Sequence, residues 1–144
     1  FRPAAKHHGS EIQVRGRGQV VALADANRVS QIIRILIDNA LTHTPEGTTV
    51  TVTAVRGRRN AEVIVGDDAK KGIDPRVIDR VFDRFYTGDT AIGSGLGLAI
   101  ADELAARMGG RLEVASRRGH TAFTLSLPPA EQRRRAREPA EAAV

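Results

Sequence analysis

The stretch Gly93–Leu98 is the part of this sequence whose residue types best suit the binding of a phosphate. Its glycines stand at every second position, and glycine lets a backbone approach a ligand closely and adopt angles that other residues resist. A helical pattern follows directly, with Ser94 as a candidate N-cap. The free N–H groups and positive dipole of such a helix start attract a phosphate. The alternative is a flexible loop with an ordinary helix cap, and this stretch alone does not decide between them.

Three other polar residues have positions that suit chemistry. Asn39 falls on or beside the apolar stripe of a helix predicted from Asp25 to about His43. Its amide oxygen either bonds to a neighbouring backbone or is offered to a hard cation such as Mg²⁺. Asp67 and Asp68 follow a predicted strand, where a carboxylate is common both in binding sites and as an exposed loop acid.

The composition limits the class of protein. With 144 residues, 41% of them hydrophobic and 27% charged, the chain has the size and mix of one globular domain. The absence of cysteine excludes disulfides and thiolate metal sites. No apolar run approaches the roughly 20 residues of a membrane span. The net charge of +5 permits contact with nucleic acid, but no base-stacking aromatics or recognition helix support that function, so no nucleic-acid partner is expected.

Hydrophobic periodicity predicts the elements that must position these residues. Two short antiparallel strands come first, then the long helix capped by Asp25, two strands joined by an arginine-rich turn, a short helix starting at Pro75, the helix after the glycines, and a last hairpin. The expected ranges are 11–15, 19–24, 25–43, 48–55, 61–66, 75–84, 112–116 and 121–127, and the helix after the glycines is expected to end at Gly109 and Gly110.

Four ordered motifs in this arrangement resemble the catalytic and ATP-binding domain of bacterial sensor histidine kinases, in the GHKL superfamily. Residues 32–45 resemble the N box, 65–73 the first glycine box, 81–86 the F box and 93–98 the second glycine box. Residues 121–128 resemble the closing strand of that family. Residues 1–10 are interpreted as a linker from a missing N-terminal region, 11–128 as the domain, and 129–144 as a flexible charged tail.

The resemblance implies an α+β Bergerat ATP-binding fold. This is a two-layer α/β sandwich in which a mixed, mainly antiparallel five-stranded sheet, plus a small N-terminal strand pair, packs on three helices.

It also implies ATP and Mg²⁺ as ligands. Asn39 would hold Mg²⁺, Asp67 or Asp68 would accept the adenine amino hydrogen, and Thr121 would support the base. Strand alternation favours Asp67 and motif spacing favours Asp68, so both stay candidates. No catalytic residue is assigned. The other expected nucleotide contacts are His43, Lys70, Lys71, Gly72, Ile73, Tyr86, Gly93, Ser94, Gly95, Leu96, Gly97 and Leu98.

The sequence departs from the family pattern at several positions. The first box lacks a glycine at Lys70, or carries one extra residue if Asp67 begins it. Ile35 and Thr42 stand where the N box usually has a polar residue and a cation, and the short segment before the second glycine box lacks its customary arginine. We therefore hypothesise that Lys70 or Lys71 supplies the missing cation.

The function implied is transfer of the γ-phosphoryl group of ATP to a histidine on a separate dimerisation domain of the same kinase, followed by transfer to a response regulator. The chain begins with Phe1 and is expected to be the cytoplasmic portion of a longer, membrane-bound sensor. One alternative is a degenerate GHKL domain that senses nucleotide or acts as a scaffold. Another is an anti-sigma-type serine kinase, which Ile35 disfavours because such enzymes usually carry an acid in the N box.

Overall fold

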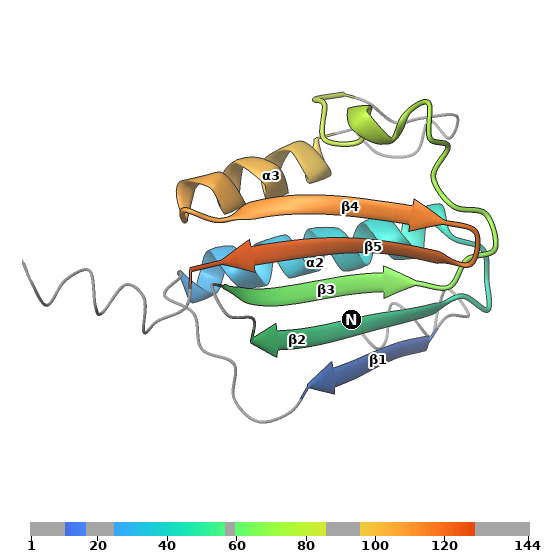
Figure 1. The fold of residues 1–144 in the computed structure, drawn as a ribbon, viewed down its shortest axis with the longest axis horizontal. Coiled ribbons are helices and arrows are strands. Elements are labelled where there is room, and N and C mark those ends of the chain that lie inside the picture. The colour runs from blue at the N-terminus through green and yellow to red at the C-terminus, as the bar shows by residue number, and fades with distance from the viewer. Residues whose placement is uncertain (1–10, 17–24, 57–59, 86–95, 129–144) are drawn as a thin grey trace, which may run out of the picture.

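The computed structural model describes residues 11–16, 25–56, 60–85 and 96–128. Within these ranges the chain forms one layer of strands and one layer of helices, as Figure 1 shows. The elements are β1 (Glu11–Gly16), α2 (Ala26–His43), β2 (Thr49–Arg56), β3 (Ala61–Asp67), the 3₁₀ helix η1 (Ile78–Arg80), α3 (Gly97–Arg107), β4 (Arg111–Arg117) and β5 (His120–Leu127).

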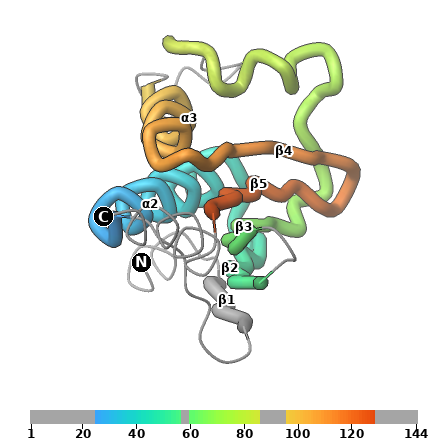
Figure 2. Tube along the Cα trace, turned by 60° about the vertical axis from the view of Figure 1, so that its left-hand side comes forward, coloured from blue at the N-terminus to red at the C-terminus, as the bar shows by residue number. Residues whose placement is uncertain are grey.

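The sheet has five strands in the order β1-β2-β3-β5-β4. β1 pairs in parallel with β2, and the other neighbours are antiparallel. Alternate residues of β5 are buried against the helices, beginning with Thr121 and Phe123. Figure 2 shows α2 and α3 together on one side of the sheet. The result is a two-layer α+β architecture.

Helix α2 forms the centre of the helical layer. The side chain of Asp25 accepts hydrogen bonds from the N–H groups of Asn27 and Arg28, so it caps the helix as predicted. Ile32 and Leu36, one turn apart, are fully buried against the sheet. The other core residues come from α2, α3 and the strands β2 to β5. They are Ile37, Ala40, Leu41, Val50, Val65, Ala101, Ala105, Leu112, Phe123, Leu125 and Leu127.

Helix α3 starts later than the sequence suggested. Its N-cap is Leu96, without a side-chain capping bond, so the prediction of Ser94 as N-cap was wrong. Closely spaced glycines disfavour helical backbone, which delays the first turn to Gly97. The helix ends as expected near its glycine pair, where Gly109 has φ +73° and the N–H of Gly110 bonds to the carbonyl of Ala105 at 2.9 Å.

Two further predictions need correction. The helix expected over 75–84 is a series of turns containing only η1, because the backbone bonds there join a carbonyl to the third residue on, as in Val77 to Arg80 and Arg80 to Asp83. The described residues therefore hold two α-helices and η1 instead of three full helices. The first strand is the parallel fifth strand of the main sheet, while its predicted partner over 19–24 lies outside the described residues. The proposed linker 1–10 and tail 129–144 lie outside them too. Among the helices described, none combines the length and apolar character needed to cross a bilayer.

Candidate functional site

On the side of the sheet that faces the helices, the row of buried apolar side chains along each of β3 and β5 has a polar residue at one end. In β3, Asp67 is the next residue on that face after buried Val65, and in β5, Thr121 precedes Phe123 in the same way. The strand register pairs Asp67 directly with Thr121. In Figure 1 the end of β3, the start of β5 and the C-terminal end of α2 all lie at the same side of the molecule. The fold thus gathers candidate site residues from three elements at one end of the two layers.

Asp67 is a carboxylate held in a desolvated position. Burial raises the pKa of its carboxyl above the ordinary value, and the hydrogen bond from the N–H of Ala69 opposes this shift. That bond joins the Ala69 nitrogen to Oδ1 at 3.1 Å. Within the described part of the chain, no donor reaches Oδ2. Asp67 therefore keeps one carboxylate oxygen available for the amine of a ligand.

Asp68 has a different environment. It is exposed, and its Oδ1 accepts a hydrogen bond from the N–H of Thr49 at 2.7 Å, while its own N–H bonds to the Thr49 carbonyl at 3.3 Å. These bonds fix the start of β2 against the end of β3. The geometry favours Asp67 over Asp68 as the acid that faces the helical layer.

Asn39 lies in a row of side chains along α2. It is half-buried and stands one helical turn after Ile35 and one before His43, so the three share a face. A Cβ atom at Gly97 would lie 3.4 Å from Cγ2 of Ile35, which places the start of α3 beside this row. Desolvation lowers the pKa of His43 below its ordinary value.

Asn39 alone cannot form a magnesium site, and the remaining ligands of the ion would have to be water and the phosphates of a bound nucleotide. The amide of Asn39 has no hydrogen-bond partner among the described side chains. In the same ranges no three His, Asp or Glu side chains come together as a metal site. Mg²⁺ is commonly held by one or two protein groups together with water and substrate phosphates. Asn39 can serve such an ion as a single oxygen ligand.

The loop after β3 is anchored to the β4–β5 hairpin. Oγ of Ser116 accepts a hydrogen bond from the N–H of Ile73 at 2.8 Å and lies 2.6 Å from Oγ1 of Thr121. The N–H of Gly119 bonds to the Lys70 carbonyl at 3.2 Å. At Gly72 the approach is so close that a Cβ atom would lie 2.7 Å from Oγ of Ser116. Ser116 was not among the predicted site residues. The sequence could have indicated it, because Ser116 follows Leu112 and Val114 on the same face of β4 and is the polar residue at the end of that face.

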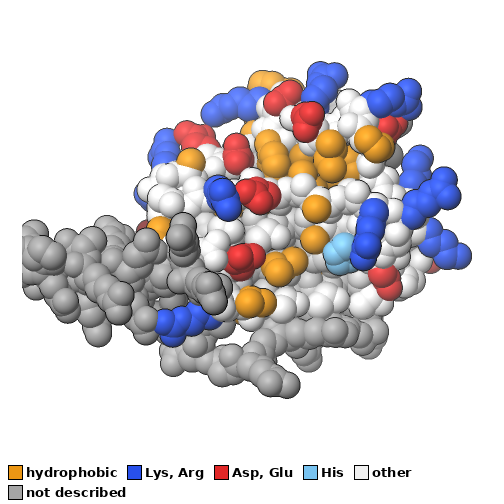
Figure 3. All heavy atoms as spheres, in the orientation of Figure 1, with side chains coloured by type: hydrophobic (Ala, Val, Ile, Leu, Met, Phe, Trp, Pro, Cys, Tyr) orange, Lys and Arg blue, Asp and Glu red, His pale blue; other side chains and the backbone are white. Residues whose placement is uncertain are grey.

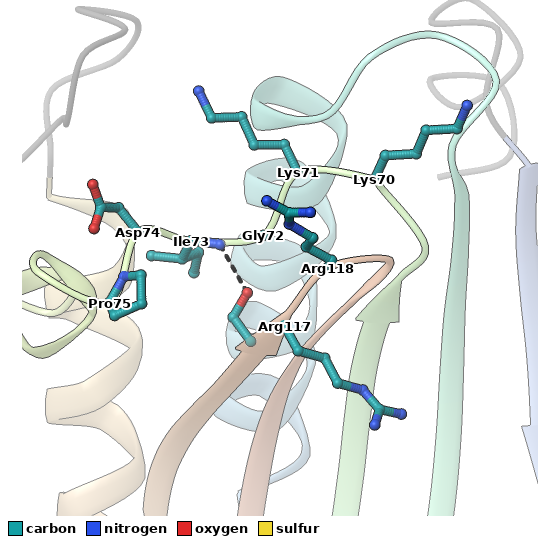
Figure 4. A pocket seen from close by; sticks show the side chains of 9 residues that line it. Lys70, Lys71, Gly72, Ile73, Asp74, Pro75, Arg117 and Arg118 are labelled. Carbon is teal, nitrogen blue, oxygen red and sulfur yellow. Dashed lines mark hydrogen bonds between the residues drawn. The ribbon is translucent and has the colours of Figure 1, made fainter.

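Lys70 and Lys71 line a cavity between this loop and the hairpin turn. The cavity has a volume of about 660 Å³ and is lined by residues 70–75 and 116–118. Figure 4 shows both lysines extending from the loop, with Arg118 beneath Lys71. Lys and Arg side chains also gather at this end of the surface in Figure 3. Neither Asn39 nor Asp67 lines the cavity, so a role for the lysines toward the nucleotide phosphates stays a prediction.

The second glycine box is described only from Leu96 onward. Gly97 begins α3 and Leu98 packs against the hydrophobic core, so this leucine has a structural contact of its own. The remaining predicted contacts Tyr86, Gly93, Ser94 and Gly95 lie outside the described residues.

The comparison with protein families decides the class of this fold and site. Residues 24–131 match the family described as "Histidine kinase-, DNA gyrase B-, and HSP90-like ATPase". The chain belongs to this ATPase family. The match covers the whole described part of the domain except β1.

Curated relatives of this ATPase domain are sensor kinases. It is 35% identical over 131 residues to the sensor-like histidine kinase SenX3 of Mycobacterium tuberculosis, which is 87% of this chain and 32% of SenX3. It is also 35% identical over 134 residues to the sensor protein IrlS of Burkholderia pseudomallei, which is 89% of this chain and 28% of IrlS. The chain therefore spans about a third of the length of these relatives.

Solved structures of histidine kinases share the fold of this ATPase domain. The mycobacterial sensor histidine kinase MprB superposes with a TM-score of 0.74 at 28% identity, covering 88% of this chain and 89% of that one. Full-length ShkA in complex with AMPPNP gives a TM-score of 0.79 at 32% identity, covering 90% of this chain and 27% of that one. The predicted resemblance to the ATP-binding domain of histidine kinases is confirmed.

Proposed function

We propose that this domain binds Mg-ATP and donates the γ-phosphoryl group to a histidine on a separate dimerisation domain. The observation that carries the proposal is the pairing of desolvated Asp67 with buried Thr121 at the end of the layers that holds Asn39. One end of such a site recognises a base, and the other carries a ligand for a cation on phosphates. That combination suits a nucleoside triphosphate.

Base recognition rests on Asp67 and Thr121. Oδ2 of Asp67, which receives no hydrogen bond from a described residue, accepts a hydrogen from the exocyclic amino group of adenine, and Thr121 is paired with Asp67 in the strand register. A base with an oxygen at that position would face the carboxylate without a donor. Because an unpaired buried carboxylate is costly, this arrangement discriminates strongly in favour of adenine.

The phosphate end is assigned to Asn39 and the start of α3. Leu96, the N-cap of α3, makes no side-chain capping bond, and the positive dipole at such a helix start attracts negative charge. Bound Mg²⁺ would neutralise phosphate charge, with Asn39 as its protein ligand. The acceptor histidine forms a bond to the γ-phosphorus as the bond to the bridging oxygen breaks, and ADP leaves. Positioning and charge stabilisation supply most of the catalysis in such a reaction.

We propose that the acceptor histidine belongs to another domain, because neither histidine of the described residues, His43 or His120, has a suitable setting. His43 ends α2 and His120 begins β5. His7 and His8 belong to the expected linker. We propose that the domain works with its cognate dimerisation domain and a response regulator, as the cytoplasmic portion of a membrane-bound sensor.

Calorimetric titration with ATP and Mg²⁺ tests the binding step. The wild-type domain should bind, and Asn39→Ala should bind at least tenfold more weakly, since loss of a metal ligand removes on the order of 1.4 kcal/mol or more. Asn27→Ala is the matched control, because Asn27 lies in the first turn of the same helix, away from the site. Equal affinities for the two variants, or no binding by the wild-type domain, would contradict the proposal.

Addition of the dimerisation domain and γ-labelled ATP tests the transfer step. The expected product carries an acid-labile label on the added domain. An acid-stable label would indicate a serine kinase instead. ATP binding without labelling of the added domain would favour the alternative function, a degenerate domain that senses nucleotide or acts as a scaffold. The altered first glycine box, with Lys70 in place of a glycine, is the reason for considering that alternative.

A further inference from the structure

Ser116 connects the loop after β3 to Thr121 and has no role in the function described above. It lies half-buried near the end of β4, on the face covered by the helices. Its Oγ accepts the hydrogen bond from the N–H of Ile73 that the dashed line in Figure 4 marks, and it lies 2.6 Å from Oγ1 of Thr121. One hydroxyl therefore contacts both the loop and the residue paired with Asp67.

The number of protons available limits how these two hydroxyls can bond. A serine hydroxyl has one donor and two acceptor sites, and the N–H of Ile73 occupies one acceptor site of Ser116. If Ser116 donates to Thr121, the single proton of Thr121 is left to donate to a ligand. If Thr121 donates instead, its proton is used and it can only accept. The direction of the bond between Ser116 and Thr121 thus decides whether Thr121 keeps a proton for a ligand.

A donor at Thr121 beside an acceptor at Asp67 matches one purine edge. Adenine presents an amino donor next to a ring nitrogen that accepts. Guanine presents a carbonyl acceptor next to a ring N–H, which is the reverse order. A Thr121 hydroxyl that donates therefore adds to the discrimination supplied by Oδ2 of Asp67.

The same hydroxyl holds the loop at a fixed distance from the strands. Gly72 permits this contact, since a Cβ atom there would lie 2.7 Å from Oγ of Ser116 and 2.8 Å from the Arg117 carbonyl oxygen. The bond from Gly119 to Lys70 holds the other side of the loop. The segment from Lys70 to Ile73, where the first glycine box departs from the family pattern, is thus held by a hydrogen bond at each of its ends.

We propose that Ser116 is a positioning residue that orients the Thr121 hydroxyl as a donor and fixes the adjacent loop, so that the site prefers adenine over guanine nucleotides. This inference rests on the proposed ATP binding. Ser116 acts through Thr121 and Ile73 and does not touch the nucleotide itself.

The test compares ATP and GTP affinities by calorimetry in Ser116→Ala, Thr121→Val and the double variant. Ser116→Ala should reduce the ATP-to-GTP preference about tenfold, and the double variant should lose no more than about twofold beyond Thr121→Val, because the two residues act in one chain. Ser116→Thr keeps the hydroxyl and should retain the preference. Thr124→Val is the matched control, since Thr124 is on the same strand but the opposite face.

A readout without nucleotide separates this inference from the proposed function. Amide hydrogen exchange at Ile73 should be at least about tenfold faster in Ser116→Ala than in the wild-type domain, because its acceptor is lost. Unchanged exchange would overturn the anchoring role. Equal losses for ATP and GTP in Ser116→Ala would overturn the orienting role and leave ATP binding intact. A wild-type domain that binds neither nucleotide would overturn the proposed function.

Discussion

Asp67 and Asp74 stand on either side of the same loop, and their carboxylates lie in opposite environments. Desolvation raises the pKa of Asp67, and its one hydrogen bond from a described residue leaves Oδ2 available. The side chain of Asp74 is 40% exposed and holds Arg76 through the backbone N–H and the guanidinium of that arginine, with Nη2 at 2.7 Å from Oδ2. These hydrogen bonds from Arg76 lower the pKa of Asp74 to about 2.

The comparison shows which kind of carboxylate can recognise a ligand. The oxygens of Asp74 are already occupied by a charged partner in water, so an added amine would gain little there. Asp67 is partly withdrawn from water and keeps an open oxygen, so a hydrogen bond from a ligand offsets its desolvation. We infer that spare bonding capacity in a desolvated position, and not charge alone, distinguishes the carboxylate proposed to bind adenine.

The largest expected effect comes from removing the charge of Asp67. Asp67→Asn should weaken ATP binding about tenfold to a hundredfold, because hydrogen bonds to a charged acceptor contribute about 1.5–3 kcal/mol. Asp74→Asn should leave ATP affinity within about twofold, since its carboxylate is exposed and paired. Calorimetric titration of both variants makes the comparison, and equal losses would break the distinction between the two acids.

The loop between the two acids should be sensitive at Gly72. Gly72→Ala should lower the free energy of unfolding by about 1–3 kcal/mol, because the new methyl would overlap the Arg117 carbonyl oxygen and Oγ of Ser116. Gly119→Asn is the control: Gly119 has φ +79° with open space around it, and Asn tolerates that conformation. Urea denaturation of both variants measures the difference, and a stable Gly72→Ala would contradict the close packing.

The pH dependence should separate the two acids in sign. Asp67 must be ionised to accept from adenine, so ATP affinity should fall as pH drops through its raised pKa, while Asp74 with a pKa of about 2 stays ionised. The free energy of unfolding depends on pH as well. Because the pKa of Asp67 is higher in the folded than in the unfolded chain, its protonation stabilises the fold at pH values below the unfolded-state pKa, and this stabilisation is lost as pH rises through the folded-state pKa. The pKa of Asp74 is lower in the folded chain, so its ionised form stabilises the fold at pH values above the unfolded-state pKa, and this stabilisation is lost as pH falls toward about 2. Calorimetry across the acid range should show a decline in ATP affinity that Asp67→Asn lacks; a decline in both would assign it to another group.

The smallest effect is expected for the lysines between the acids. Lys70→Ala with Lys71→Ala should weaken ATP binding about fivefold at low salt and less at high salt, as expected for exposed charges worth about 1 kcal/mol. Arg107→Ala with Arg111→Ala removes the same charge from the opposite end of α3 and the start of β4. If ATP affinity is unchanged in the lysine variant, or falls equally in both, the lysines do not supply the missing cation.

Local signals in the sequence were sufficient for most of the fold. The Asp25 cap, the apolar stripe of α2 and the alternation in β2, β3, β4 and β5 each act over a few residues, so these elements were predicted within one or two residues of their bounds. The turns over 75–84 were misjudged as a helix because an apolar pattern does not distinguish repeated turns from an α-helix.

By itself, the sequence determined the family, the order of elements and the short set of polar residues from which a site is built, because motif order and periodicity are properties of the chain. Only the tertiary structure decided that Asp67 faces the helices while Asp68 bonds to Thr49, and that β1 joins β2 in parallel. It alone brought Ser116 against Ile73 and Thr121. Those outcomes depend on strand register and on contacts between residues far apart in the chain. The pKa of Asp67 is raised by burial, and this burial exists only once the two layers have packed together.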